Sequence, residues 1–424
     1  MAHPVSERPV IDTFQAALAP RIIARLDALA AVSADPGAIT RVYLSPEQAR
    51  ASALVLDWMR EAGMTARIDA VGNCIGRIEG PIPGGPAVVI GSHLDTVRDA
   101  GRFDGPLGVV AGIECIAALV RTGVVLPFAI EVVGFADEEG TRFATTLIGS
   151  RALAGTLTRD ALDRPDADGI TMGQALLAAG FDPDRIGEAA RAPGAVRAYL
   201  ELHIEQGPAL ERAGLAVGLV TAISGATRLA VTLTGEAGHA GTVAMAGRHD
   251  ALAGAAECIL AVEARCTPEP GLVGTVGTIL AAPGAVNVIP GRVGFSLDLR
   301  APDDRQRRIA LADLAAAFAE IATRRGLELD RVVTHDAACA PCDPALMAHL
   351  AAGIAAEGHP VLRLPSGAGH DGMALAAIAP IAMLFVRCRG GISHHPDEFA
   401  SGPDIEAGAR VLLATLLRLA AEGM

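Results

Sequence analysis

Six imidazole and carboxylate side chains of this chain could bind metal, and most of them stand near a glycine where a short apolar segment ends. They are His93, Asp104, Glu138, Glu139, His203 and His394. In open α/β sheets the ligand site lies at the carboxyl ends of the strands, and borderline ions such as Zn²⁺ bind this mixture of nitrogen and oxygen ligands. Taken one at a time, each of these residues is as typical of a solvated polar loop as it is of a metal site. The residues alone therefore leave a metal site and ordinary polar loops both open.

The local spacing of these residues has chemical uses. Asp95 stands two residues after His93, where its carboxylate can accept the second N–H of the imidazole and fix its tautomer. Asp104 can bridge two metal ions, since each carboxylate oxygen can bind one. Glu138 and Glu139 are adjacent, so one can bind a metal while the other stays free as a base.

Apolar strands alternating with helices must position these groups. Strands are predicted at 87–91, 128–135, 199–204 and 381–386, and helices at 11–31, 45–62, 107–121 and 344–357. This alternation is typical of a mostly parallel sheet with helices on both faces. We therefore predict an α/β fold for this part of the chain.

The pattern changes after residue 223. Strands are predicted at 228–234, 271–281, 293–299 and 327–333, and helices at 250–265 and 306–325. The order β-α-β-β-α-β is that of a ferredoxin-like unit. We predict a catalytic domain made of residues 1–223 and 334–424, with residues 224–333 inserted as a second domain.

Composition excludes several classes of protein. The chain has 424 residues and a formal net charge of -13, and such an acidic surface repels nucleic-acid backbones. No apolar run reaches the ~18 residues of a membrane span, and the first residues lack a secretory signal. Seven scattered cysteines indicate reduced thiols, so we expect a cytoplasmic protein. The pair Cys339 and Cys342 forms a CxxC, which could be redox-active or half of a zinc site.

Eight segments resemble the M20 superfamily of metal-dependent peptidases and amidohydrolases. They are most similar to its branch of allantoate amidohydrolases, N-carbamoyl-L-amino acid hydrolases and β-ureidopropionases. The matching segments are GSHLDTV from Gly91, GRFDGPLGV from Gly101, ADEEGTRF from Ala136, ELHIEQGP from Glu201, GEAGHAGT from Gly235, NVIPG from Asn287, PSGAGHDGM from Pro365 and GISHHPDE from Gly391. His203 marks this branch, because the peptidases that the chain resembles have an acidic residue there.

The resemblance implies a site for two divalent metal ions, zinc or manganese. It implies that His93 and His203 bind one ion, that Glu139 and His394 bind the other, and that Asp104 bridges them. The adjacent His395 is the alternative to His394.

The resemblance also implies the catalytic groups. Glu138 would be the general base, and Asp95 would support His93. His239 would act across the interface of a homodimer and steady the reacting carbonyl oxygen. The inserted domain would then serve as both lid and dimerisation domain.

Substrate contacts are implied for Gln206, Arg228, Asn287, Arg300, Gly369 and His370. A basic residue at Arg228 favours allantoate as the small carboxylate substrate whose ureido C–N bond is hydrolysed. N-carbamoyl-L-amino acids or β-ureidopropionate are the alternative, and an M20-type aminopeptidase is a more distant one. A metal-bound binding module without activity is the non-enzymatic alternative.

Overall fold

The structure, a computed structural model, describes residues 17–422 and divides into two compact units. Unit 1 consists of the chain up to Thr221, of Cys342–Leu364 and of the chain from Gly369 onward. Unit 2 consists of Ala222–Pro341 together with the short segment Pro365–Ala368. Each unit has its own sheet and its own helices.

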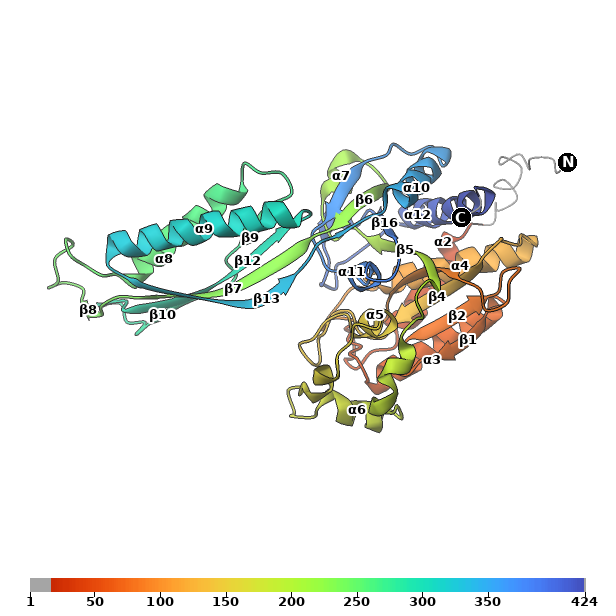
Figure 1. The fold of residues 1–424 in the computed structure, drawn as a ribbon, viewed down its shortest axis with the longest axis horizontal. Helices are drawn as coiled ribbons and strands as arrows, with labels where there is room; N and C mark the ends of the chain where they lie inside the picture. Colours follow the sequence, from red (N-terminus) through yellow and green to blue (C-terminus); the bar gives the residue numbers. More distant parts are fainter. Residues whose placement is uncertain (1–16, 423–424) are drawn as a thin grey trace. The chain divides into compact units, whose positions relative to one another are not determined.

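The larger sheet, which lies mainly in unit 1, is parallel in its centre and antiparallel towards both edges (Figure 1). Its strand order is β1-β2-β4-β3-β5-β16-β6-β14, with β15 paired to β6. The pairs β4–β3, β3–β5 and β5–β16 are parallel. The bounds are β1 Thr65–Ile68, β2 Cys74–Ile78, β3 Ala87–His93, β4 Ala129–Phe135, β5 Val196–Ile204, β6 Val217–Ile223, β14 Ala340–Pro341, β15 Arg363–Ser366 and β16 Ile381–Val386.

Helices pack against this sheet. Helix α4 contacts β3, β4 and β5, and it is buried on every side from Pro106 to Leu119, as expected of a helix that is apolar all round. The longer helices of unit 1 are α2 Ala19–Ala30, α3 Pro46–Glu61, α4 Pro106–Thr122, α10 Pro344–Ala356 and α12 Gly402–Ala421. The shorter ones are α5 Ile148–Leu153, η1 Arg159–Asp163, α6 Met172–Ala178, η2 Pro183–Ala189, α7 Ala209–Ala213, α11 Gly372–Leu375 and η3 Arg389–Gly391.

The predicted α/β fold is confirmed for unit 1, with differences in detail. Residues 11–16 of the first predicted helix lie outside the described residues. The pattern did not predict the hairpin β1–β2, because β1 is mostly exposed and lacks apolar alternation. It also missed α12, although the sequence held the signal: Ser401 accepts a hydrogen bond from the N–H of Asp404, as an N-cap residue does.

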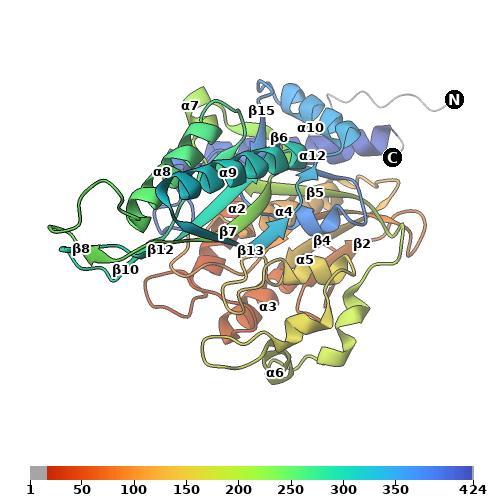
Figure 2. The same cartoon turned by 60° about the vertical axis from the view of Figure 1, so that its left-hand side comes forward.

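The sheet of unit 2 is antiparallel, with the order β10-β12-β7-β13 and β9 beside β12. Helices α8 and α9 lie along this sheet (Figure 2), so the predicted ferredoxin-like order is confirmed. The single strand expected at 271–281 is two strands, β9 and β10. The bounds are β7 Gly225–Thr234, β8 Gly238–His239, α8 Ala251–Cys266, β9 Val273–Thr275, β10 Ile279–Ala282, β11 Val288–Ile289, β12 Arg292–Ala301, α9 Asp304–Arg325 and β13 Glu328–Ala337.

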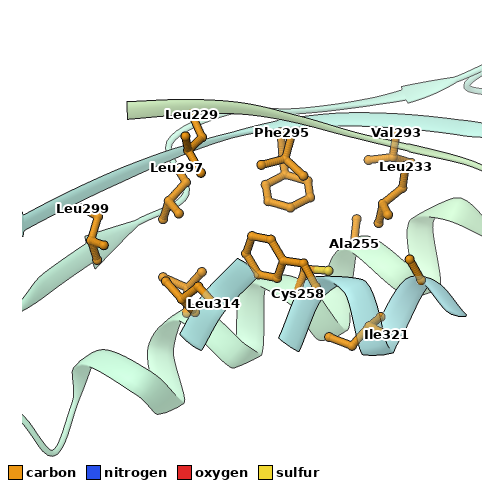
Figure 3. Close-up of a cluster of buried hydrophobic side chains, with 14 of the residues drawn as sticks. Leu229, Leu233, Ala255, Cys258, Val293, Phe295, Leu297, Leu299, Leu314 and Ile321 are labelled. Carbon is orange, nitrogen blue, oxygen red and sulfur yellow. The ribbon is translucent and has the colours of Figure 1, made fainter. Parts of the chain in front are cut away.

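The core of unit 2 lies between the sheet and its two helices (Figure 3). Alternate residues of β12 are buried there, and Phe295, Leu297 and Leu299 face Leu314 of α9 in this cluster. Because side chains alternate across a strand, the residues between them face away from the helices.

No helix within residues 17–422 combines the length and the apolar character that crossing a membrane requires. All seven cysteines are free. Burial raises the pKa of the Cys342 thiol to about 12, which does not favour the redox interpretation of the CxxC.

Candidate functional site

The four central strands of unit 1 bring their carboxyl ends to one edge of the sheet. His93 is the last residue of β3 and pairs in register with Phe135, the last residue of β4. His203 on β5 pairs with Phe385 on β16. The loops that follow β4 and β16 carry the remaining acidic and histidine residues. Parallel pairing therefore gathers groups that are far apart in sequence.

The five residues expected to bind metal form two donor groups that share Asp104. His93, Asp104 and His203 form one, and Asp104, Glu139 and His394 form the other, with the donor atoms of each group within 4.8 Å of one another. Asp104 Oδ1 lies 3.2 Å from His203 Nε2 and 3.7 Å from His93 Nε2. Asp104 Oδ2 lies 3.1 Å from His394 Nε2. The two oxygens of one carboxylate thus face different histidines, which is the arrangement a bridging ligand needs.

Two buried polar atoms of this cluster lack a hydrogen-bond partner, which indicates that a cation binds there. Asp104 Oδ1 and His203 Nε2 are buried, but neither makes a hydrogen bond within the part of the chain that the structure describes. Buried polar atoms are nearly always satisfied, so an exception needs an explanation such as an ion. The residues fit a pair of metal ions, and the clusters are consistent with a binuclear site.

The pKa values of the three histidines also indicate a cation site. Burial opposes charge on His93 and His203, but the surrounding carboxylates together outweigh it and raise the pKa of both. Asp104 contributes most to this rise, helped by Asp95 at His93 and by Glu201 at His203. Hydrogen bonds with Asp104 and Glu139 raise the pKa of His394 to about 10. Each imidazole is therefore held in an environment that favours positive charge, which a metal ion supplies once it displaces the proton.

The surroundings of the cluster are rich in buried carboxyl groups. Burial is the largest cause of a raised pKa in each of Asp137, Glu138, Glu201, Asp371 and Glu398. Buried charges are stable only when they are paired or bound to metals. This excess of acidic groups is the environment in which divalent cations are stabilised.

Asp95 holds the loop that carries the two glutamates. Its Oδ1 accepts the N–H of Glu138 at 3.0 Å, and its Oδ2 accepts the N–H of Glu139 at 3.2 Å. His93 Nδ1 lies 3.0 Å from the main-chain oxygen of Asp95 and 3.5 Å from its Oδ1. The imidazole is thus oriented mainly by the backbone, while the Asp95 side chain fixes the Glu138–Glu139 loop.

Glu138 is buried beside this cluster and outside the two groups that share Asp104. Its carboxylate belongs to a third group with His93 and Glu139. Gly369 lies against it, since a Cβ added there would be 3.5 Å from Glu138 Oε1. Burial and the carboxylate of Glu139 raise the pKa of Glu138 well above its usual range, with His93 opposing them.

Gln206 and His394 meet on the exposed side of the cluster. Both have positive φ, 56° and 54°, a conformation that non-glycine residues adopt at a cost and often at functional sites. Gln206 Nε2 donates to Asp104 Oδ2 at 3.0 Å and to Ser393 Oγ at 3.2 Å. The side chain of His394 is 50% exposed against 1% for His203. A substrate can therefore approach from the His394 side.

The loop between β3 and α4 has no room for a side chain at Gly105. Gly105 has a φ of +82°, and an added Cβ would lie 2.5 Å from ring atoms of His93. Gly123, at the other end of α4, has a φ of +70° but nothing within 4 Å. Both glycines have positive φ, but a Cβ would clash with a neighbouring side chain only at Gly105, where it would meet the imidazole of His93.

We expect Gly105→Ala to lower the free energy of unfolding by about 2–4 kcal/mol, because strain at positive φ adds to a clash with a fixed imidazole. Gly123→Ala should cost only about 1–2 kcal/mol, from the strain alone. Denaturant titration and metal content of both variants check this. Equal losses in the two variants would contradict the clash with His93.

His239 and Asn287 lie together in unit 2. The short strands β8 and β11 pair His239 with Val288, and the N–H of Ala240 donates to the oxygen of Asn287. The N–H of Gly241 donates to His239 Nδ1 at 3.0 Å. In the neutral imidazole the proton therefore lies on Nε2, and the residue as a whole is exposed. Among the described residues, His239 belongs to none of the donor groups.

Arg228 and Arg300 line a cavity of about 780 Å³ in unit 2. Asp298 lies between them and forms ion pairs with both. Four hydroxyl side chains also line the cavity, those of Ser224, Thr275, Ser296 and Thr334. The cavity therefore offers charged and hydroxyl groups suited to a small polar ligand.

Sequence reasoning missed several residues of the cluster. Glu201 stands two residues before His203 on β5, and it accepts hydrogen bonds from Ser92 and from the N–H of Gly372. With His203 and His370 it forms a fourth group of possible ligands. The period of two along a strand was the available signal, because it places Glu201 on the same face as His203.

Comparison with known proteins agrees with the geometry. The model of the family "Peptidase family M20/M25/M40" matches residues 89–418. An N-carbamoyl-L-amino acid amidohydrolase of Geobacillus stearothermophilus is 45% identical over 94% of this chain and 98% of its own length. The allantoate deiminase of Arabidopsis thaliana is 40% identical over 96% of this chain and 83% of its own length.

Solved structures show the same fold. An amidase of the hydantoinase/carbamoylase family from Burkholderia multivorans superimposes with a TM-score of 0.89 at 37% sequence identity. The match covers 96% of this chain and 98% of that structure. Both units therefore have counterparts in one protein of known structure.

Proposed function

Because the chain belongs to the peptidase family M20/M25/M40, in its carbamoylase and allantoate deiminase branch, we propose that it hydrolyses the ureido C–N bond of N-carbamoyl-L-amino acids. The products are the amino acid, carbon dioxide and ammonia. One observation carries the proposal: two donor groups share Asp104, and Glu138 lies buried next to them.

The residues of the cluster divide the chemistry. His93, Asp104, Glu139, His203 and His394 would hold two divalent metal ions, which when bound would lower the pKa of a water molecule and polarise the ureido carbonyl. The Glu138 carboxylate accepts the proton of the attacking water and delivers it to the leaving nitrogen. Asp95 keeps the Glu138 backbone in place through the hydrogen bond to its N–H.

Groups of unit 2 complete the proposed site. The Nε2–H of His239 donates to the oxygen that develops negative charge, and it acts from the partner subunit of a homodimer. Arg300 and Arg228 bind the carboxylate of the substrate. The inserted domain acts as the lid, whose closure excludes water. Gln206, Asn287, Gly369 and His370 contact the substrate. We also propose that the bound metal is zinc or manganese and that the enzyme is cytoplasmic.

The ranking of substrates differs from the expectation drawn from the sequence, which placed allantoate first. The 45% and 43% identical relatives are N-carbamoyl-L-amino acid amidohydrolases, and the allantoate deiminases follow at 40%. The expectation that allantoate ranks first depended on the positive charge of Arg228. Its charge is partly offset by Asp298, so it is a weaker sign of a highly polar substrate. Allantoate remains the second candidate, because Arg228 lines the cavity.

The test is ammonia release from a panel of substrates after reconstitution with Zn²⁺ or Mn²⁺. We expect the highest kcat/KM for an N-carbamoyl-L-amino acid, a lower value for allantoate, and no cleavage of dipeptides. A higher value for allantoate would reverse the ranking. Cleavage of dipeptides alone would return the chain to the aminopeptidases, and inactivity towards every substrate would favour a binding module.

A further inference from the structure

Strand β12 presents a charged row on the face of the unit 2 sheet that lies opposite the helices. Leu297 and Leu299 are buried in the helix-packed core, so Asp298 and Arg300 face the other way. Asp298 pairs in register with Arg228 on β7 and with Thr275 on β9. The register therefore places one aspartate beside two arginines on a single face.

Asp298 contacts both guanidinium groups at once. Its Oδ1 accepts Nε–H of Arg300 at 2.8 Å, and its Oδ2 accepts an Nη2–H of Arg300 at 3.0 Å. The same Oδ2 accepts Nε–H of Arg228 at 2.9 Å. Burial opposes ionisation of Asp298, but these hydrogen bonds outweigh it and lower its pKa. The carboxylate is therefore charged at neutral pH.

These contacts decide which arginine atoms remain for a ligand. Nη1 of Arg300 donates to the oxygen of Gly367 at 2.8 Å. Nη1 and Nη2 of Arg228 make no hydrogen bond to any of the described residues, and this side chain is 50% exposed. Asp298 thus holds Arg228 by its Nε and leaves the end of the guanidinium fork open.

The charged side chains that line the cavity are Arg228, Asp298 and Arg300, so its formal charge is two positive minus one negative, or +1. His335 is paired with Arg228 on the neighbouring strand. Its pKa is lowered by burial and by Arg228, so it adds no charge at neutral pH. One substrate carboxylate would neutralise the net charge of +1 in the cavity. A second substrate carboxylate would be repelled by Asp298, and no further cationic side chain of the cavity would be available to pair with it.

We infer that Asp298 is a positioning residue that aims Arg228 and Arg300 and restricts this cavity to substrates with a single carboxylate. The inference rests on the proposed function and adds a selection rule to it: neutral N-carbamoyl-L-amino acids are accepted, and those with an acidic side chain are rejected. The selection comes from a charge that repels the second carboxylate as well as from charges that attract the first.

Two nearly isosteric substrates test this rule. The measured quantity is the ratio of kcat/KM for N-carbamoyl-L-aspartate to kcat/KM for N-carbamoyl-L-asparagine. We expect Asp298→Asn to raise this ratio roughly five- to tenfold, the effect of removing one unit charge near a partly exposed ligand. A purely structural role would lower both rates together and leave the ratio unchanged, which would overturn the inference.

Further variants separate charge from folding. Asp298→Glu keeps the charge and should keep the ratio of the unaltered protein. The ratio should be higher in the double variant Arg228→Gln/Asp298→Asn than in the single variant Arg228→Gln, by the same factor. The double variant removes both charges of the Arg228–Asp298 ion pair, so neither charge is left unpaired by the loss of the other. It therefore tests the inference even if Asp298→Asn alone does not fold.

The matched control is Asp330→Asn. Asp330 is an exposed aspartate of the same sheet and does not line the cavity, so the ratio should not change. If the unaltered protein hydrolyses neither substrate nor any other ureido acid, the proposed function fails and the inference fails with it. If it hydrolyses both and the ratio does not respond to the charge of residue 298, only the inference fails.

Discussion

Glu138→Gln is expected to lower kcat by about 10²- to 10⁴-fold, the range that positioned acid–base groups contribute, while both metal ions stay bound. The glutamine amide has nearly the shape of the carboxylate, but it cannot accept a proton from water. The backbone hydrogen bond from residue 138 to Asp95 does not depend on the side chain. The loop should therefore keep its conformation.

This variant also separates two roles of Glu138. Glu138 forms a possible ligand group with His93 and Glu139, so it could bind a metal instead of moving a proton. Metal content measured beside kcat decides between them. A slow enzyme with two ions supports the base, a slow enzyme that has lost an ion indicates a ligand, and a variant with near-full rate rejects both roles.

A matched control is Glu357→Gln. Glu357 pairs with Arg410 in unit 1 and, within residues 17–422, belongs to none of the possible metal-ligand groups. Its replacement should reduce stability without changing kcat. Glu138→Gln should do the opposite, because it replaces a buried carboxylate whose pKa is raised by burial with a neutral group.

The centre of the fold was predictable because its strands are short, apolar and bounded by glycine or polar residues. The predicted strand 381–386 coincides with β16, and the strand at 87–91 forms most of β3. The position of His93 at the end of β3 followed from the same pattern. Once these strands are parallel neighbours, convergence of the residues at their ends is a matter of topology.

The supporting contacts were not predictable, because they join loops that are remote in sequence. Glu398 accepts the N–H groups of Phe103 and Asp104, which lie 295 and 294 positions away. It also accepts the hydroxyl of Ser393 at 2.8 Å. Glu398 ends the segment GISHHPDE, but that segment does not show which backbone groups its carboxylate contacts. Its role depends on how two loops approach one another.

The substrate preference inferred from Arg228 also depended on a contact that the sequence does not show. The residue type of Arg228 suggested a strongly polar substrate, but the charge that a ligand meets depends on strand register. The register places Asp298 directly opposite. The sequence identifies the arginine and the aspartate, but it does not show that they face each other on neighbouring strands. The pairing is what changes the chemical meaning of Arg228.

The second large effect is expected from the proposed role of Asp104 as a ligand that bridges two metal ions. We expect Asp104→Asn to lose at least one metal ion and to lower kcat by ~10³-fold, since bound ions supply several kcal/mol of transition-state stabilisation. An amide has only one oxygen, so it cannot present acceptors to both His203 and His394, which now face different oxygens of Asp104.

Metal analysis, kcat and the rise in Tm on adding Zn²⁺ or Mn²⁺ measure this effect. Ligands that bind only the folded state raise Tm, so a variant with fewer ions should show a smaller rise. The control is Asp99→Asn in the same loop, where the residue is exposed and has a φ of 51°, a conformation that asparagine tolerates. Because both variants remove one negative charge from one loop, equal metal content and equal rates in the two would mean that Asp104 does not bridge the ions, and a proton rather than a metal would then be what its buried oxygen and His203 share.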